Sequence, residues 1–330
     1  MRNNTRPVLF DTDIGIDDAM ALLFLHYAPE IQLLGITTRF GNASVEDTTR
    51  NALNVVEHFK LKVPVFRGAA RPLAARLGEG FPAHVHGNNG LGDVDLGEPS
   101  LKYETMNAAQ AIVDNIALCR EQGKRLSIVA VGGLTNIAHA LALDGLITED
   151  IEEVIVMGGA FGYNGHRGNV SPVAEANIAS DPLAADIVFS SDLTTTIVGL
   201  DVTHEVTVDE AFLELLVKQA GEAGQFIRDI MRFYLEFYFG INQRRECPLH
   251  DSCAVAYLLQ PDLFSTIKNP VRVVTEGIAI GQTIHSDDIR RFVSKEWENI
   301  PNSNVCIGVD ADAVLKLYQA TLARAGSSCS

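Results

Sequence analysis

Short apolar runs alternate along most of the chain with segments whose apolar residues recur at helical spacing. The runs predict buried strands at Val8–Phe10, Leu33–Thr38, Val63–Phe66, Leu126–Val131, Val154–Met157 and Thr195–Leu200. The intervening segments predict helices at Ile16–Tyr27, Ser44–Phe59, Ala108–Gln122, Asn136–Leu143 and Pro182–Ser190. Strands that alternate with helices indicate βαβ crossovers. We therefore expect an α/β, Rossmann-like protein with a mostly parallel central sheet and helices on both faces.

The last third of the chain has a different pattern. It predicts helices over Ala211–Phe239, from Asp251 up to Leu259 and over Ala311–Ala323, and a hairpin formed by Val271–Val274 and Ile278–Ile284. No repeat or low-complexity linker separates this part from the rest. We expect residues 1–330 to form one domain, with these C-terminal elements added to the sheet.

Polar residues and glycines follow several of the predicted strands. Asn42, the pair Gly132–Gly133 and Asp201 each stand at or just beyond a strand end. In open parallel sheets, ligands bind at the carboxyl ends of the strands. Residues 71–99 and 158–171 are rich in Gly and Pro and too long for ordinary turns, which is typical of functional loops. The pattern therefore predicts a ligand site at this edge.

Composition narrows the class of partner. The 330 residues are 47% hydrophobic, enough for a substantial core, and the formal net charge is −16. An acidic balance argues against nucleic acid or an anionic membrane as partner. No apolar run reaches the ~20 residues of a membrane helix, and the N-terminus has no signal-peptide pattern. We expect a cytoplasmic protein, and a neutral or cationic ligand remains open.

The cysteines do not indicate a structural site. They are odd in number, widely spaced and without a CxxC pair, so neither zinc nor a disulfide framework is predicted. We expect reduced thiols at Cys119, Cys247, Cys253, Cys306 and Cys329.

The densest candidate chemistry directly follows the first predicted strand. Residues 11–19 read DTDIGIDDA and carry carboxylates at Asp11, Asp13, Asp17 and Asp18. Helix capping accounts for one or two of these acids, not four. Because crowded carboxylates repel one another, a hard cation is the usual means of holding them together.

Two other acidic loops are alternatives. An EF-hand counted from Asp11 would place Gly15 and Leu22 where oxygen ligands are needed, so it does not fit. A phosphoryl-transferring aspartate after a strand, as in haloacid-dehalogenase-like phosphatases, stays open. It would require a hydroxyl where Gly15 stands.

The stretch DTDIGIDDA resembles the N-terminal signature of the nucleoside hydrolases (inosine–uridine-preferring family), usually D-x-D-P-G-x-D-D-A. Further segments match the family in the same order, over roughly residues 7 to 260: FGN at Phe40–Asn42, HGNNG at His86–Gly90, GGLTNIA at Gly132–Ala138, NVSPVAEANIASDP at Asn169–Pro182 and LHDSCAVAY at Leu249–Tyr257. The resemblance implies hydrolysis of the N-glycosidic bond of ribonucleosides with a tightly bound Ca²⁺ ion.

The resemblance also implies roles for individual residues. The calcium ligands would be Asp13, Asp18, the backbone carbonyl of Val131, and Asp251. Asp13 would also be the general base for the metal-held water, and Asp11 would support the loop from behind. The ribose hydroxyls would be bound by Asp17, Asn42, Asn169, Glu175 and Asn177.

This assignment agrees with the chemistry of the residues. Calcium takes six to eight oxygen ligands, which leaves room for water and sugar hydroxyls beside three carboxylates and a carbonyl. Glycosidic cleavage passes through a cationic, oxocarbenium-like transition state, which a carboxylate-rich pocket stabilises. The departing base still needs a proton of its own.

His250, beside Asp251, is the candidate acid for the leaving base, although a lone histidine is more often structural. His86, in a Gly-rich loop, is a candidate contact to the base or a loop anchor, with His84 as its neighbour. Tyr234 and Tyr238 match positions that wall the base pocket, whereas the phenylalanines of the same predicted helix are interpreted as core.

Several positions depart from the family pattern. Ile14 replaces the usual Pro and should cost the loop some rigidity. Val131 stands where Thr is common, and the change should be tolerated because the carbonyl is the ligand. Asn88–Asn89 and Ala176 replace Glu-Ser and Phe, which leaves loop contacts and the pocket wall open.

We therefore expect a calcium-dependent ribonucleosidase of nucleoside salvage that releases free base and ribose, in a homodimer or homotetramer. The alternatives are a metal-dependent phosphatase of the Asp-x-Asp type and a non-catalytic nucleoside- or ribose-binding protein. The residues do not rank purine against pyrimidine nucleosides.

Overall fold

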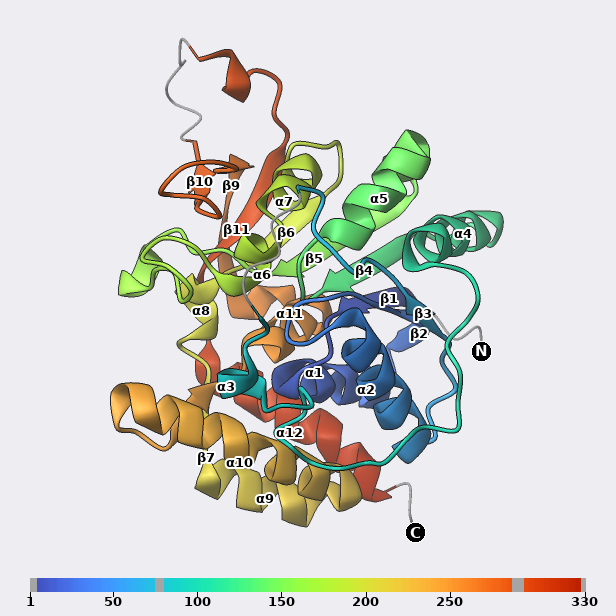
Figure 1. Ribbon diagram of the computed structural model, residues 1–330, viewed down its shortest axis with the longest axis vertical. Helices are drawn as coiled ribbons and strands as arrows, with labels where there is room; N and C mark the ends of the chain where they lie inside the picture. The colour runs from blue at the N-terminus through green and yellow to red at the C-terminus, as the bar shows by residue number, and fades with distance from the viewer. Residues whose placement is uncertain (1–4, 75–79, 287–293, 328–330) are drawn as a thin grey trace.

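A mixed sheet runs through the centre of the protein (Figure 1). The computed structural model describes residues 5–74, 80–286 and 294–327. Within this part, nine strands pair in the order β10–β9–β11–β6–β5–β4–β1–β2–β3. In that order the strands cover Thr283–His285, Phe264–Val273, Asn302–Val309, Thr195–Val198, Ile151–Met157, Leu126–Ala130, Arg6–Thr12, Ile31–Thr38 and Val65–Arg67.

All pairs from β11 to β3 are parallel, and β9 is antiparallel to both β10 and β11. The chain winds in one direction from β1 to β3 and in the other from β4 to β6, so its direction reverses between β1 and β4. At such a switch point the crossovers diverge and leave a crevice at the carboxyl ends of the strands. The acidic stretch at 11–19 follows β1 and therefore begins there.

Alternate strand residues face two separate hydrophobic cores. Val8 and Phe10 of β1 belong to one core and Leu9 to the other, and β4 divides in the same way between Val129 and Ile128. Because successive strand side chains point to opposite faces, buried apolar runs of this kind require helices on both sides.

Helices cover both faces, as predicted (Figure 1). One face carries α1 (Ile16–Tyr27), α2 (Val45–His58), α9 (Glu210–Ala220), α10 (Glu222–Asn242), α11 (His250–Leu259) and α12 (Ala311–Ser327). The other carries α4 (Ala108–Glu121), α5 (Thr135–Leu143) and α7 (Pro182–Phe189). The remaining elements are α3 (Ala83–His86), α6 (Ala176–Ser180), α8 (Leu200–Thr203) and the two-stranded sheet of β7 (Thr207–Asp209) and β8 (Glu246–Pro248).

The predicted elements are confirmed to within a few residues, with two corrections. The strand expected over Thr195–Leu200 ends at Val198, and α8 begins at Leu200, so Asp201 lies in a helix. The single helix expected over 211–239 is two helices, because Gly221 between them has φ +58° and ψ −122°, a backbone conformation that glycine adopts far more readily than other residues and that cannot continue a helix.

The predicted hairpin is present as β9 and β10, with different bounds. β9 begins at Phe264 because it also pairs with β11, and β10 is confined to Thr283–His285. Strand β11 escaped prediction because Asn302, Ser303 and Asn304 open it and Gly308 interrupts its apolar pattern.

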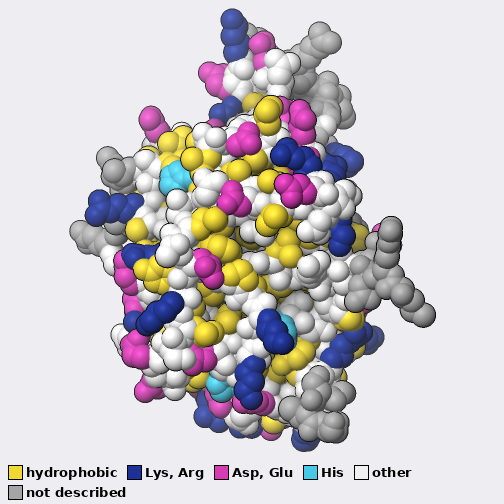
Figure 2. All heavy atoms as spheres, turned by 90° about the vertical axis from the view of Figure 1, so that its right-hand side faces the viewer, with side chains coloured by type: hydrophobic (Ala, Val, Ile, Leu, Met, Phe, Trp, Pro, Cys, Tyr) yellow, Lys and Arg dark blue, Asp and Glu magenta, His cyan; other side chains and the backbone are white. Residues whose placement is uncertain are grey.

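The cysteines match expectation where they are described. Cys119, Cys247, Cys253 and Cys306 are buried free thiols, and Cys329 lies outside the described residues. Among the helices of the described part, none has the length and apolar character that a bilayer crossing requires. On the face shown in Figure 2, Lys and Arg side chains are interspersed with Asp and Glu and form no continuous basic area.

Candidate functional site

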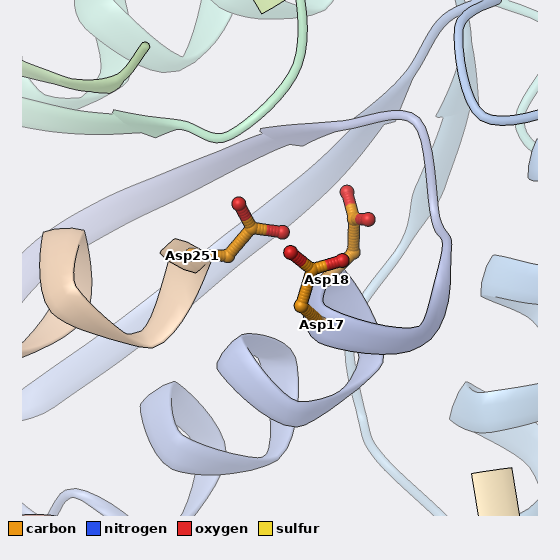
Figure 3. Close-up of side chains that lie close together, drawn as sticks. All are labelled: Asp17, Asp18 and Asp251. Atoms are coloured by element: carbon orange, nitrogen blue, oxygen red, sulfur yellow. The ribbon is translucent and has the colours of Figure 1, made fainter. Parts of the chain in front are cut away.

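Three buried carboxylates converge from the two ends of the chain. Asp17 and Asp18 lie in the first turn of α1, and Asp251 lies in the first turn of α11. One oxygen of each lies within 4.8 Å of the others, and Figure 3 shows the side chains pointing toward a common space. Both helices begin at this point, so their exposed N–H groups and dipoles favour negative charge there.

Glycine at position 15 permits this convergence. A Cβ on Gly15 would lie 2.6 Å from both Asn42 Nδ2 and His86 Nδ1, so only glycine allows the loop this close to its neighbours. The N–H of Gly15 donates to Asp18 Oδ2 at 2.8 Å, which closes the first turn of α1. Thr12 Oγ1 donates to Asp18 Oδ1 at 2.5 Å and Asn42 Nδ2 donates to Oδ2 at 2.9 Å. Asp18 is therefore held in one orientation.

Asp13 is held differently, because one of its oxygens is free. Its Oδ2 accepts from the Asn42 N–H at 2.9 Å. Its Oδ1 is buried and has no hydrogen-bond partner among the described residues. Gly41 and Gly132 make room for the carboxylate, since a Cβ on Gly132 would lie 2.7 Å from Oδ1. A buried carboxylate oxygen without a partner is costly, and a ligand that contacted Oδ1 would remove this cost.

The electrostatics of the cluster call for a cation. Burial, reinforced by neighbouring carboxylates, raises the pKa of Asp13 and of Asp251 well above the usual value, and that of Asp17 to about 8. Burial also raises the pKa of Asp18. The donors are all oxygens, which suits a hard cation such as Ca²⁺ or Mg²⁺. The residues present thus fit a divalent metal ion.

The cluster of mutually close oxygens differs in two respects from the predicted carboxylate ligands, because it includes Asp17 and does not include Asp13. Asp17, predicted to bind ribose, stands with Asp18 and Asp251 in the cluster of mutually close oxygens. The carbonyl of Val131, a predicted ligand, accepts a hydrogen bond from Asn177 Nδ2 at 2.9 Å. Carbonyl oxygens have two lone pairs, so this bond leaves one for a cation.

The remaining predicted ribose contacts surround α6. Glu175 caps this helix and accepts from the N–H groups of Asn177 at 2.8 Å, Ile178 at 3.1 Å and Gly159 at 2.9 Å. Asn169 is exposed, and its Oδ1 accepts from the Ala176 N–H at 3.0 Å. Asn177 Nδ2 also donates to the Met157 carbonyl, at 3.1 Å. Their observed contacts therefore hold the loop after β5 in place.

His250 is buried and hydrogen-bonded through both ring nitrogens. Nδ1 lies 2.7 Å from Thr203 Oγ1, and Nε2 lies 2.9 Å from the hydroxyl of Tyr238. Burial, helped by His204, holds the pKa of His250 well below its usual value. The imidazole is therefore neutral near pH 7, with one nitrogen as donor and the other as acceptor.

His86 is also buried and neutral. Its Nδ1 accepts from the Ile16 N–H at 3.3 Å, which places the ring proton on Nε2, and burial lowers its pKa to about 3. Its ring lies 5.8 Å from that of Tyr234, whose hydroxyl is 3.5 Å from Asp17 Oδ2. His84 is exposed and packs against Phe237, so of the two loop histidines it is His86 that lies at the acidic cluster.

The departures from the family pattern have clear surroundings. Ile14 is fully buried in the first core, and its carbonyl accepts from Asn51 Nδ2 at 3.3 Å. Asn89 Oδ1 accepts from the Leu91 N–H at 2.8 Å and so shapes the loop after α3. Ala176 is exposed, which leaves the position open where an aromatic wall is usual.

Arg39 escaped prediction. Directly after β2, it is fully buried beside the acidic residues, and its Nη1 donates to Ser180 Oγ at 2.9 Å. The signal available was a lone basic residue at the edge where acidic residues follow strands, but one residue does not make a pattern.

Comparisons with known proteins point to one family. The family model described as inosine-uridine preferring nucleoside hydrolase matches residues 8–316. Uridine nucleosidase 1 of Arabidopsis thaliana is 37% identical over 320 residues, which cover 96% of this chain and 92% of that protein. An inosine-uridine preferring nucleoside hydrolase of Leishmania major is 38% identical over 282 residues, which cover 84% and 87%.

Solved structures show the same similarity. A plant nucleoside hydrolase superposes with a TM-score of 0.90 at 32% identity and covers 96% of this chain and 99% of its own. A purine-preferring ribonucleoside hydrolase of Gardnerella vaginalis superposes with a TM-score of 0.88 at 32% identity, covering 98% and 100%. Because the family model matches this chain over nearly all of its 330 residues, the chain belongs to the inosine-uridine preferring nucleoside hydrolase family.

Proposed function

We propose that the protein hydrolyses the N-glycosidic bond of ribonucleosides with the help of a bound Ca²⁺ ion. The observation that supports this best is the site at the head of α1. Asp17, Asp18 and Asp251 have oxygens within 4.8 Å of one another, and Asp13 Oδ1 is buried with no hydrogen-bond partner in the part of the chain that the structure describes. Family membership supports nucleoside hydrolysis, and the all-oxygen donor set supports the choice of calcium.

In this proposal Asp13, Asp18, Asp251 and the Val131 carbonyl hold the ion, and Asp17 lies close enough to join them or to bind the sugar. When bound, the ion would lower the pKa of a water molecule that it contacts and would fix the ribose hydroxyls. Bringing the ion in would also offset the mutual repulsion of the carboxylates.

Asp13 is the residue best placed to accept the proton of the attacking water. Its Oδ2 is fixed by the Asn42 N–H, while its Oδ1 is free to accept a new hydrogen bond. A carboxylate held by one oxygen and open at the other can orient water and accept its proton in the same position. Gly132 leaves the space that this requires.

His250 is the candidate donor for the leaving base. The base departs with a lone pair that needs a proton, and His250 could supply it as an imidazolium and return to the neutral imidazole. Because burial holds the pKa of His250 low in the free protein, the ring would have to take up this proton when the nucleoside binds. The 2.9 Å contact with Tyr238 makes the phenol the nearest partner of Nε2. A proton could reach the base from Nε2 directly or through this hydroxyl, with His250 as its source in either case.

Asn42, Asp17 and Asn177 surround the predicted ribose position, and Glu175 and Asn169 support the loop behind it. The similar proteins differ in the substrates that their names give, from uridine to purine nucleosides. The proposal is therefore for ribonucleosides as a class, and release of free base and ribose would place the enzyme in nucleoside salvage.

A reducing-sugar assay over inosine, adenosine, guanosine, uridine and cytidine tests this function. We expect ribose release that stops after treatment with a calcium chelator and returns when calcium is restored. Release of phosphate from nucleotides with none of ribose would instead favour the phosphatase alternative. Nucleoside that stays bound and intact for hours in the presence of calcium would favour a binding protein.

A further inference from the structure

Arg39 is a buried cation at the acidic site. It follows β2 directly, has 0% relative exposure, and is the largest fully buried side chain in the described part of the protein. Its guanidinium donates to Ser180 Oγ at 2.9 Å and to Thr135 Oγ1 at 3.2 Å, while Nε has no hydrogen-bond partner among the described residues. Burial of a guanidinium costs several kcal/mol unless nearby charge compensates it.

The compensating charge comes from three buried aspartates. Asp13, Asp11 and Asp181 are the carboxylates whose charge acts on Arg39. None of them forms an ion pair with Arg39 within 4.0 Å in the described part of the chain; Asp181 is reached through Thr135, whose hydroxyl donates to Asp181 Oδ2 at 2.7 Å. Asp11 Oδ2 and Asp13 Oδ1 are both buried, and neither has a hydrogen-bond partner among the residues described. The arginine therefore acts on them through space, in surroundings that screen charge poorly.

The loop after β4 is shaped for this arrangement. A Cβ on Gly132 would lie 2.7 Å from Asp13 Oδ1, and a Cβ on Gly133 would lie 2.5 Å from Arg39 Nη1 and 2.3 Å from Ser180 Oγ. Adjacent glycines thus make room for a carboxylate and for a guanidinium. The ring of Phe40 lies 3.8 Å from Arg39 Cζ and covers the cation further. The guanidinium of Arg39 is therefore enclosed by Gly133, Ser180 and the ring of Phe40.

We propose that Arg39 is a built-in counter-charge of the acidic site. It offsets carboxylate repulsion while no metal ion is bound, and for the same reason it lowers the affinity for the ion. Arg39 is thus a positioning residue that sets how far the fold depends on its metal. The effect on calcium affinity rests on the proposed calcium site, whereas the effect on carboxylate repulsion in the metal-free protein does not.

Three variants separate charge from hydrogen bonding. Arg39→Gln removes the charge and keeps N–H donors, Arg39→Lys keeps the charge, and Arg272→Gln is the matched control. Arg272 forms a two-fold hydrogen-bonded ion pair with Asp186, at 2.7 Å for each bond, between β9 and α7. Thermal unfolding is measured after chelator treatment and again with calcium, and calcium binding is measured by titration calorimetry.

We expect chelator-treated Arg39→Gln to melt at a lower temperature than Arg39→Lys. Calcium should raise the Tm of Arg39→Gln more than that of wild type and should bind about three- to tenfold tighter, as a removed unit charge implies at partial screening. Arg39→Lys should bind calcium within about twofold of wild type. Arg272→Gln should lose the same Tm with and without calcium.

Two results would overturn the proposal that Arg39 is a counter-charge. One is an equal loss of Tm in Arg39→Gln and Arg39→Lys, and the other is calcium binding in Arg39→Gln that is as tight as in wild type or weaker. If calcium does not change the Tm of wild type, the proposed calcium site is wrong. The comparison of chelator-treated Arg39→Gln with chelator-treated Arg39→Lys still tests whether Arg39 offsets carboxylate repulsion. If Arg39→Gln does not fold even with calcium, the behaviour of Arg39→Lys tests the role of the charge. A folded, calcium-binding lysine variant supports the role of charge, and an unfolded one overturns it.

Discussion

Tyr238 and His250 are joined by a 2.9 Å hydrogen bond between the phenolic oxygen and Nε2 of the imidazole. The two residues lie on different helices, α10 and α11, and the contact is partly buried, with His250 directly before Asp251 in the chain. Nδ1 contacts Thr203 Oγ1, so in the proposed mechanism the proton would pass to the leaving base from Nε2, on the Tyr238 side of the ring. This geometry makes the leaving-group role of His250 testable by the choice of substrate.

For His250→Ala we expect kcat with natural nucleosides to fall by about 10²–10⁴-fold, the usual range for the loss of a general acid. With a p-nitrophenyl riboside, whose leaving group needs no proton, the loss should be small. Tyr238→Phe, which removes only the hydroxyl, should show the same dependence on the leaving group with a smaller loss. Equal losses on both substrates would assign His250 a structural role.

Asp13→Asn should lower kcat by at least ~10³-fold, because the amide keeps the shape of the side chain but can neither accept the water proton nor bring negative charge. Asn42 N–H can still donate to the amide oxygen, so the fold should be retained. Asp209→Asn is a suitable control, since it changes an exposed N-cap of α9 to another good N-cap. Ribose release and bound calcium are measured for both, and normal turnover in Asp13→Asn would contradict its role as the base.

The metal-free protein should lose stability as the pH rises from about 4 to about 8. Burial, with Asp18 nearby, raises the pKa of Asp17 from 3.8 to about 8 in the folded state. Between these values the folded state holds a proton that the unfolded state has released, so the free energy of unfolding falls as pH rises until the group ionises near pH 8. Calcium displaces this proton, and the Tm increase on adding calcium should therefore grow between pH 6 and pH 9. A calcium-induced increase that is independent of pH would show that the carboxylates are already ionised.

The sheet could be predicted from the sequence because its strands are buried on both faces. Runs such as Val8–Phe10 and Val154–Met157 stand out as apolar without any tertiary information. Strand β11 lacked that signal, because Asn302, Ser303 and Asn304 are polar. The break between the helices at Gly221 could not be predicted either, because a helical apolar pattern continues across it and only the positive φ of Gly221 in the structure shows that the helix ends there.

The candidate site could likewise be predicted only in part from the sequence. Asp13 and Asp18 could be singled out because four acids follow one strand, and Asp251 because a motif marks it. Arg39 could not, since its significance depends on partners that only the fold brings to it: Thr135 at the head of α5 and Ser180 at the end of α6. The inclusion of Asp17 in the carboxylate cluster depends likewise on where α1 and α11 meet.

Gly132→Ala tests whether the space beside Asp13 is required for function. The added Cβ would lie 2.7 Å from Asp13 Oδ1, closer than real Cβ contacts allow, so the carboxylate or the loop must move. A displacement of about 1 Å at a reacting group can cost ~10²-fold in rate, and we expect a kcat loss of that order with weaker calcium retention. Gly145→Ala is the matched control, because a Cβ there meets nothing within 4 Å and its φ is not positive. Both variants add one methyl group, so wild-type kcat in Gly145→Ala and a loss in Gly132→Ala would assign the effect to the position of Asp13. Wild-type activity in Gly132→Ala would instead show that the orphaned Oδ1 is not the atom on which the reaction depends.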